Sequence, residues 1–334
     1  EAHRIKTPGA RQSKALHRLA GIAGYRMILT GTPVTQGPLD FWSMYHFLSP
    51  GYFGNSFYSF RNRYANMVEI GGPNGRFKKV VSYKNLDELA AKAHAIAYRI
   101  TKAEALDLPE QVDVIRECTL ESAAAKVYRD MVRESVAELE SAATVTAANV
   151  LARLLRLSQI TGGFVGGDDA RLHQVSKAKL ELLEDVLEDL IAAGKKVVIF
   201  ARFTPEMRAI EDLLIKREIG YARIDGDVDM KTRGGEIMRF REDAGCMVFL
   251  AQIQTAGLGI TLTAADTAIY YSLSYSLADY DQSRSRIHRL GQKNACTYIH
   301  LVAKDTVDEQ VIRALAGKRD IAAAVVDNWR ALLR

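Results

Sequence analysis

Residues 196–201 read Lys-Val-Val-Ile-Phe-Ala, five apolar residues in succession after one charged residue. A short, wholly apolar run is typical of a strand that is buried on both faces of a parallel sheet. Before it, apolar residues at helical spacing extend from Ser176 to Gly194, and after it Thr204-Pro205 starts a second helix with proline in its first turn. A strand between two such helices predicts an α/β fold.

The carboxyl-terminal half of the chain repeats this alternation. Strand-like runs lie near residues 222–224, 247–251, 268–271 and 298–302, and helical patterns fill the gaps near 230–241, 279–289 and 306–326. The alternation predicts a parallel sheet with helices on both faces. Ligands of such sheets bind at the carboxyl ends of the strands, so we expect the functional loops there.

The first 170 residues follow other patterns. One strand-like run, residues 26–30, needs neighbouring strands to bury its two faces. Later segments have helical spacing at 86–97, 121–140 and 147–160, with a glycine-rich loop at 71–75 and a linker at 161–169. We therefore expect three parts, which are residues 1–50, a mainly helical part 51–170, and 171–334.

The composition is that of an ordinary globular protein. The 334 residues, enough for about two domains, are 48% hydrophobic and 25% charged. The net charge of +5 suits a polyanionic partner, and it suits a plain solvated surface equally well. No apolar run approaches the roughly 20 residues that cross a bilayer, so we expect no membrane partner.

The cysteines indicate a reducing compartment. Cys118, Cys246 and Cys296 lie far apart and form no CxxC pair, which argues against a zinc site or a disulfide framework. We expect a location in the cytoplasm or with the nucleoid, and the nucleus stays open as a third location.

Residues 282–292 carry the most informative pattern for function, Gln-Ser-Arg-Ser-Arg-Ile-His-Arg-Leu-Gly-Gln. On a helix, Gln282, Arg286 and Arg289 fall at i, i+4 and i+7, and thus on one face. Two guanidinium groups fixed on one face suit the charge that develops on a transferring phosphoryl group. From these residues alone, the alternative is a solvated basic face that pairs with Asp279 or Asp281.

This stretch resembles the last signature motif of superfamily 2 helicases in its Swi/Snf-type spelling, Q-x-x-x-R-x-H-R-x-G-Q, at every fixed position. Other segments resemble motifs of that family in the same order along the chain. They are residues 1–6 (D-E-x-H without its Asp), 29–33 (L-T-G-T-P), 39–50, 98–109, 196–203, 224–240 and 255–266 (G-G-x-G-x-N-L-T-A-A, with Ala256 and Thr261 replacing Gly and Asn). The chain thus resembles the C-terminal half of a Swi/Snf-type DNA-dependent ATPase.

The resemblance implies a fold and a set of site residues. The fold is a RecA-like helicase C-terminal lobe, preceded by a helical insertion and by a remnant of a first RecA-like lobe. Arg286 and Arg289 would approach the γ-phosphate of ATP, and Glu1 would be a catalytic base. The remaining candidates are Gln282, Gly257, Gly259, Thr30, Gly31 and Thr32 for ATP binding and coupling, and Thr255, Asp225, Gly226 and Arg233 for DNA.

The resemblance also implies partners and cofactors. ATP and Mg²⁺ would be held mainly by the first lobe, because the chain has no G-x-x-x-x-G-K-[ST] loop for the phosphates. Double-stranded DNA would be the track, and a protein on that DNA is a further candidate partner. We expect no metal site in the chain itself, since His288 has no His or Cys at ligand spacing. The resemblance predicts an ATP-driven DNA translocase or remodeller that is inactive without its N-terminal lobe.

Two other functions stay open at this point. The missing phosphate loop fits a non-catalytic module that binds DNA or a protein partner. The Thr261 substitution is similar to the annealing-helicase branch of the family, which acts at forked DNA.

Overall fold

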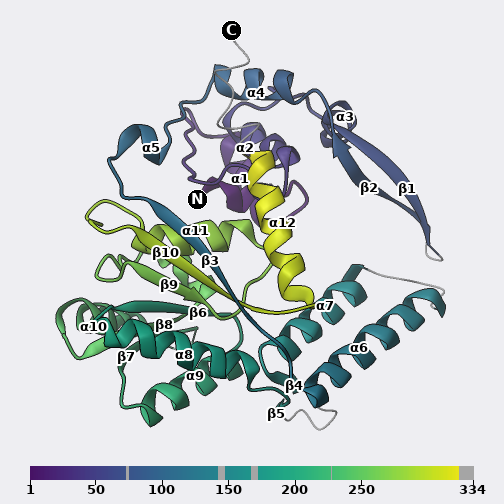
Figure 1. Cartoon of the computed structure of the whole chain (residues 1–334). Coiled ribbons are helices and arrows are strands. Elements are labelled where there is room, and N and C mark those ends of the chain that lie inside the picture. Colours follow the sequence, from purple (N-terminus) through teal and green to yellow (C-terminus); the bar gives the residue numbers. More distant parts are fainter. Residues whose placement is uncertain (73–74, 142–146, 167–171, 227, 323–334) are drawn as a thin grey trace. The chain divides into compact units, whose positions relative to one another are not determined.

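The computed structural model describes the chain except residues 73–74, 142–146, 167–171, 227 and 323–334 (Figure 1). The chain divides into two compact units. The first contains residues 1–105, 276–278 and 314–334, and the second contains residues 106–275 and 279–313. The two units are described separately.

A six-stranded sheet forms the centre of the second unit, and all of its strands are parallel. The central strand β6 (Val197–Ala201) is buried at all five positions, as its apolar run predicts. The order is β3-β10-β9-β6-β8-β7. The bounds are β3 Gln111–Cys118, β7 Gly220–Ile224, β8 Cys246–Gln252, β9 Thr267–Tyr270 and β10 Cys296–Ala303. The predicted α/β fold with a parallel sheet is confirmed.

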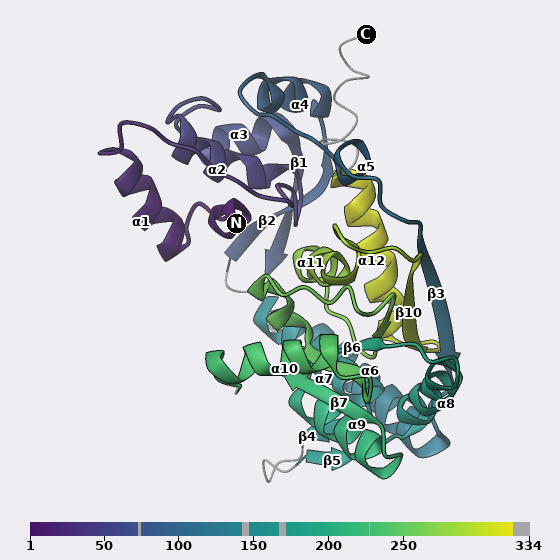
Figure 2. The ribbon, with the colours of Figure 1, turned by 90° about the vertical axis from the view of Figure 1, so that its left-hand side faces the viewer.

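Helices cover both faces of this sheet. Helices α8 (Ala178–Ala192) and α9 (Thr204–Lys216) pack on one face, where they bury Val197 and Ile199 (Figure 1). On the other face, α10 (Met230–Glu242) places Phe240 against Phe249, with ring centroids 5.2 Å apart (Figure 2). Helix α11 (Leu277–Ile287) lies on that same face, because the ring of Tyr280 packs 5.2 Å from that of Tyr270.

The helical patterns in the middle of the chain are confirmed, but three β elements there were not predicted: β3, the β1–β2 hairpin and the β4–β5 pair. Helices α4 (Leu86–Ala95), α6 (Ser122–Ser141) and α7 (Ala147–Thr161) match the expected segments. Strand β3 was missed because it is an edge strand with mostly exposed side chains, so its sequence shows no buried face. Another β element is the hairpin of β1 (Ala65–Gly72) and β2 (Gly75–Tyr83). The loop predicted at 71–75 is wrong at Gly71, Gly72 and Gly75, which are in these strands, and residues 73–74 lie outside the described residues. The second unit also contains β4 (Phe164–Gly166), which pairs with β5 (Leu172–Gln174), and the start of α12 (Val307–Ala322). The linker predicted at 161–169 is therefore wrong at residues 164–166, and residues 167–169 lie outside the described residues.

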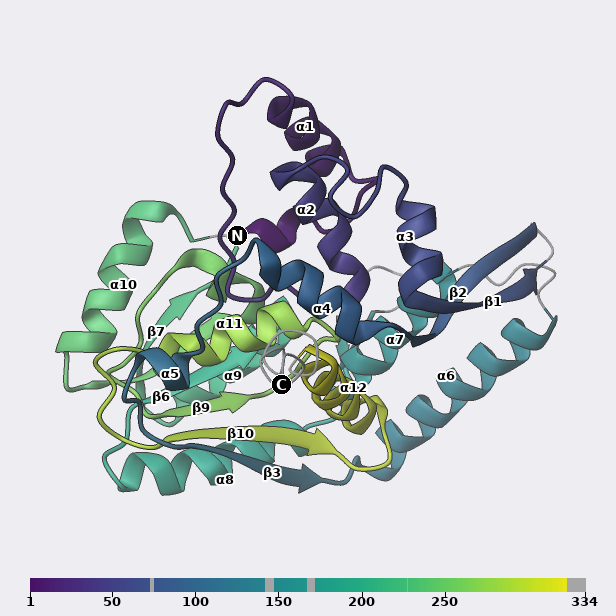
Figure 3. The ribbon, with the colours of Figure 1, turned by 90° about the horizontal axis from the view of Figure 1, so that it is seen from above.

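An aromatic core holds the first unit together. Helix α2 (Phe41–Leu48) and helix α3 (Phe57–Tyr64) bury most of it, and the Tyr45 hydroxyl donates a hydrogen bond to the Ala93 carbonyl of α4 at 2.6 Å. The buried rings are Phe41, Trp42, Tyr45, Phe60 and Tyr64. The other elements of this unit are η1 (Ala2–Ile5), α1 (Arg11–Ala20), η2 (Pro38–Asp40) and α5 (Lys102–Ala105). Figure 3 shows the helices α1 to α4 of this unit.

The strand predicted at residues 26–30 is wrong, since this segment has no regular secondary structure. Among the described residues no strand pairs with it, because β1 and β2 pair only with each other. Met27 and Leu29 are consequently 77% and 69% exposed. The Leu29 carbonyl accepts a hydrogen bond from the Ala2 amide at 3.0 Å, which fixes the segment to η1.

Candidate functional site

The motif at residues 282–292 divides its side chains between the two sides of α11. Gln282, Arg286 and Arg289 are half-buried, whereas Arg284 and His288 face the interior. The helix expected over 279–289 ends at Ile287, so Arg289 lies in the turn that follows it. That turn is closed by the Gln292 amide, which donates to the Arg289 carbonyl at 3.0 Å, and Gly291 adopts a left-handed φ of 101°.

Three hydrogen bonds join this motif to the loop that precedes β9. The Leu262 amide donates to the Arg286 carbonyl at 2.9 Å, and the Arg289 guanidinium donates to the Ile260 carbonyl at 3.3 Å. The Gln292 side chain donates to the Ala265 carbonyl at 2.8 Å. Two segments that the sequence singled out independently therefore form one site.

The glycines of this loop lie beside the arginines. Gly259 has a left-handed φ of 75°, which favours glycine, and no atom lies within 4 Å of where a Cβ would stand. Gly257 lies in the short helical turn η3 (Ile253–Leu258) directly before it. The structure thus brings Gly259 next to Arg289, with an open approach to the backbone at Gly259.

Arg284 is the buried partner of these arginines, and sequence reasoning missed it. Its guanidinium pairs with the Asp113 carboxylate of β3 and lies 3.6 Å from the centroid of the Tyr298 ring. Burial alone would lower the pKa of Arg284, but the hydrogen bond and charge of Asp113 raise it above its usual value. Tyr280 and Ile287, four positions before it and three after it, were the available sequence signal that this face is buried.

His288 also has a structural role. Its Nε2 lies 2.9 Å from the Pro109 carbonyl oxygen, and the side chain is buried. Within the part of the chain that the structure describes, no three His, Cys, Asp or Glu residues gather as ligands for a metal ion.

The candidate DNA-binding residues follow β7 and β8 at the carboxyl edge of the sheet: Asp225 and Gly226 lie in the loop after β7, Arg233 in α10 and Thr255 in η3. Arg233 donates hydrogen bonds to the carbonyls of Val228 at 2.7 Å and Asp225 at 3.1 Å, so it shapes the loop after β7. Asp225 accepts hydrogen bonds from the Arg223 guanidinium, and the Thr255 hydroxyl donates to the Gln252 carbonyl at 2.6 Å. Gly226 is exposed. Contact of these residues with DNA stays a prediction.

A buried carboxyl lies at the same edge, and no sequence pattern marks it as a candidate. Glu206 of α9 accepts hydrogen bonds through Oε2 from the amides of Arg202 and Phe203 and from the Ser272 hydroxyl. Its Oε1 has no hydrogen-bond partner among the described residues and faces Gly162, where a Cβ would lie 2.0 Å away. Burial raises the pKa of Glu206 to about 7, although the Ser272 hydrogen bond and the Lys179 charge lower it.

We expect Glu206 to make the stability of the protein pH-dependent. Its pKa is higher in the folded chain than the ordinary value of 4.5, so stability falls as the pH rises through about 7. Glu206→Gln stays neutral, and its free energy of unfolding should therefore gain about 2 kcal/mol relative to wild type between pH 5 and pH 8. Urea denaturation at both values measures this gain. Glu181→Gln, at an exposed position of α8, is the matched control, and an equal gain in both variants would contradict the role of burial.

The first unit gathers the candidates Glu1, Thr30 and Thr32 around one histidine. His3 Nδ1 lies 3.2 Å from the Thr30 hydroxyl, 3.4 Å from the Thr32 hydroxyl and 3.1 Å from Glu1 Oε2. Burial of the His3 ring lowers its pKa. Gly31, between the two threonines, is exposed with open space where a Cβ would stand. The first and second of the matched motifs therefore meet at His3.

Asp40 fixes the turn that follows these threonines. Its buried Oδ2 accepts hydrogen bonds from the amides of Thr35 and Gln36, both at 2.8 Å, and from the Thr35 hydroxyl at 3.1 Å. Three donors on one carboxylate oxygen hold residues 35–40 in a closed loop.

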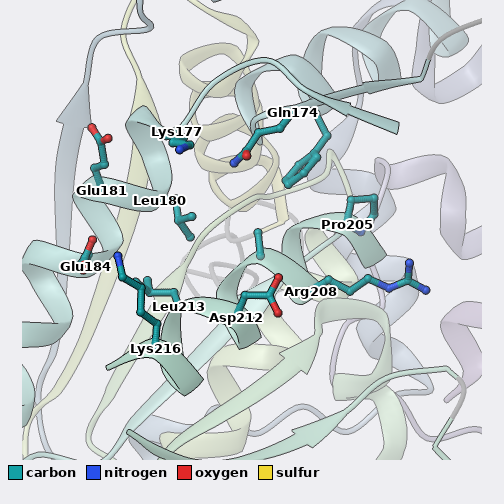
Figure 4. A pocket seen from close by; sticks show the side chains of 12 residues that line it. Gln174, Lys177, Leu180, Glu181, Glu184, Pro205, Arg208, Asp212, Leu213 and Lys216 are labelled. Carbon is teal, nitrogen blue, oxygen red and sulfur yellow. The ribbon is translucent and has the colours of Figure 1, made fainter. Parts of the chain in front are cut away.

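A groove of about 520 Å³ is a separate feature of the second unit (Figure 4). It lies between α8 and α9 and is lined by both charges, among them Lys177, Glu181, Arg208, Asp212 and Lys216. Helices α8 and α9 cover the face of the sheet opposite α11, and the lining includes none of the motif residues. The groove is therefore distinct from the site of Arg286 and Arg289.

Comparison with known protein families matches almost the whole chain. Residues 1–162 match the SNF2-related domain, and residues 178–291 match the helicase conserved C-terminal domain. The chain is similar to the uncharacterized ATP-dependent helicase MG018 of Mycoplasma genitalium, with 25% identity over 96% of this chain and 30% of the relative. It is also similar to the mouse chromodomain-helicase-DNA-binding protein 1-like, with 28% identity over 98% of this chain and 36% of the relative.

A solved structure has the same architecture. The Sulfolobus solfataricus SWI2/SNF2 ATPase core in complex with dsDNA is 26% identical, with a TM-score of 0.53, over 96% of this chain and 66% of that one. The chain spans about a third of the length of these two curated relatives. In the described residues, no helix has the length and apolar character that a membrane span requires. The two domain matches, the relatives and the RecA-like sheet all agree. The chain therefore belongs to the SNF2 family of helicase-like proteins.

Proposed function

We propose that this chain supplies the arginine fingers of an ATP-dependent duplex-DNA translocase or remodeller. The observation that carries the proposal is the joining of the arginine motif to the loop of Gly259, through the Arg286 carbonyl and the Arg289 guanidinium. Half-buried guanidinium groups that are held in place act more strongly on developing charge than mobile, solvated ones. Relatives that are named ATP-dependent helicases support the same function.

Each candidate residue has a role in this proposal. Arg289 would neutralise charge on the γ-phosphate in the transition state, with Arg286 beside it and Gln282 orienting both. Glu1 would polarise the attacking water from the first unit, where His3 holds its carboxylate. Thr30, Gly31 and Thr32 would couple that site to the DNA track.

The residues present fit the phosphate end of ATP and do not by themselves hold its metal. Arg286 and Arg289 present positive charge, and the open backbone at Gly259 admits a close approach by phosphate. No acidic cluster of the described residues suits Mg²⁺. We therefore place ATP and Mg²⁺ mainly on an N-terminal RecA-like lobe, with which this chain shares the site.

The exposed segment 26–30 supports such a partner lobe. Met27 and Leu29 line an apolar groove of about 410 Å³ in the first unit, together with Tyr98 and Ile96. An extended apolar segment without a neighbouring strand is a surface that another strand can cover. In this proposal residues 1–50 belong to the first lobe, 51–170 form the insertion and 171–334 form the second lobe.

Duplex DNA is the proposed track. The similar Sulfolobus core is described in complex with dsDNA. Contacts through Gly226, Thr255, Asp225 and Arg233 would be mostly to phosphate and therefore sensitive to salt and indifferent to sequence. A protein bound to the DNA would be the load of a remodeller.

ATP hydrolysis and movement on DNA, measured with the full-length protein, test this function. We expect hydrolysis that duplex DNA stimulates, and ATP-dependent displacement of a third strand from a DNA triplex without separation of the duplex. The 334-residue chain alone should hydrolyse no ATP. DNA binding without any hydrolysis would favour a non-catalytic module. Stimulation by forked DNA far above that by plain duplex would favour an annealing helicase, as Thr261 suggests.

A further inference from the structure

One short segment of the chain is strongly basic. Residues 57–85, which form α3, β1, β2 and the residue pair after them, contain six of the 45 Lys and Arg but one of the 40 Asp and Glu. The segment therefore carries a net charge of +5, and the rest of the chain, with 39 of each kind, carries none. Residues 1–26 carry the same net charge, from six Lys and Arg against Glu1 alone, so residues 57–85 are one of two strongly basic stretches of the chain.

The hairpin of β1 and β2 presents part of that charge to solvent. Lys78, Lys79 and the adjoining Lys84 are exposed. Across the two strands Lys79 pairs with Val68, which is 50% exposed, and Lys78 pairs with Glu69, the one acidic residue of the segment. Val81 is 64% exposed. A two-stranded ribbon with exposed side chains gains little stability from its own packing, so such an element is a natural place for an interaction.

The base of the hairpin is firmly held. Tyr64 and Ala65, where α3 passes into β1, are 1% and 2% exposed. At the end of β2 the Lys84 amide donates to the Tyr64 carbonyl at 3.0 Å, and the Asn66 side chain donates to the Ser82 hydroxyl at 2.9 Å. Figure 2 and Figure 3 show the two strands extending away from α3. A fixed base with a basic, exposed ribbon is suited to reach a polyanion.

We propose that the β1–β2 hairpin is a DNA-contacting arm that binds the phosphate backbone of the duplex through Lys78 and Lys79. This inference rests on the proposed function, because it takes duplex DNA as the track. A two-stranded ribbon fits the major groove. Successive residues of a strand point to opposite faces, so Lys78 and Lys79 would each meet phosphates on a different side of the ribbon. The arm would hold the track through contacts outside the motif loops of the sheet.

Binding of duplex DNA to the 334-residue chain, measured by fluorescence anisotropy over a range of salt concentrations, tests the arm. Lys78→Gln/Lys79→Gln should weaken binding several-fold and reduce the slope of log K against log salt by about 2, since two phosphate contacts are lost. Lys126→Gln/Lys216→Gln removes the same charge from exposed positions of α6 and α9 and should bind as wild type does. Lys78→Arg/Lys79→Arg should keep the wild-type slope.

The outcomes separate this inference from the proposed function. If Lys78→Gln/Lys79→Gln keeps the affinity and salt slope of wild type, the proposal that the hairpin contacts DNA is wrong, while DNA binding by the chain itself is unaffected. The proposal is equally wrong if Lys126→Gln/Lys216→Gln reduces the slope of log K against log salt as much as Lys78→Gln/Lys79→Gln does. If the wild-type chain binds no duplex at low salt, the arm and the proposed DNA track both fail. Thermal unfolding should be the same for all variants, because every substituted side chain is exposed.

Discussion

Arg289→Ala should reduce DNA-stimulated ATP hydrolysis by the full-length protein by about 10³-fold or more, while ATP still binds. The size of the loss is that expected for an arginine finger, which acts on charge that exists mainly in the transition state. The position of Arg289 supports this expectation, because its side chain is tethered by one 3.3 Å hydrogen bond to Ile260 and stays half-buried. Removing it should therefore cost little stability.

The measurement is kcat for hydrolysis with saturating duplex DNA, together with the Kd of a fluorescent ATP analogue. Arg289→Lys keeps the charge and loses the planar guanidinium, so it should recover only part of the activity. Arg313→Ala, on the exposed side of α12, is the control that should hydrolyse ATP at the wild-type rate. If Arg289→Ala hydrolyses ATP within tenfold of wild type, the finger assignment is wrong.

Arg284→Ala, five residues earlier in the same motif, should instead unfold the protein more easily, by about 3 kcal/mol. Removing one partner of a buried ion pair typically costs about 3–5 kcal/mol. Here the partner, Asp113, is 47% exposed and can be hydrated, which places the loss at the lower end. The variant also loses the stacking of Arg284 on Tyr298 and its hydrogen bond to the Tyr280 hydroxyl at 3.1 Å.

Urea denaturation of the 334-residue chain measures this effect, with Arg286→Ala as the matched control on the half-buried side of the helix. Arg284→Met, which fills much of the same volume, should recover part of the lost stability because packing against Tyr298 remains. Equal stability of Arg284→Ala and Arg286→Ala would show that the division of α11 into a structural and a functional side is wrong.

The parallel sheet was predictable because its inner strands are mostly apolar and its helices have clear periods. β6 and β10 are buried along nearly their whole length, and such runs have few other interpretations. β3 was not predictable, because its exposed side chains carry no pattern of burial and its pairing with β10 depends on residues far along the chain. The strand prediction at residues 26–30 was wrong for the opposite reason. The segment has the pattern of a strand, but the described part of the chain provides no strand that pairs with it.

The site was predicted in part. The glycine loop and the arginine motif were chosen separately, and the structure joins them through Ile260, Leu262 and Ala265. The roles of Arg284 and Glu206 depend on which side of a helix faces the core, and a single sequence does not reveal the identity of the residues packed against that side. The contacts of Glu1 and Thr30 with His3 could not be predicted from the sequence either. They depend on how η1 lies against a segment without secondary structure.

The pairing of β3 with β10 has a consequence for synthesis on the ribosome. Gln111 pairs with Cys296, so β3 emerges long before the strand that completes it. Until β10 has been made, the nascent chain must keep β3 apart from β6, β7 and β8, which can already associate with one another. The long-range pairing therefore delays closure of that sheet edge to a late stage of translation, when an exposed edge is most vulnerable to pairing with another chain.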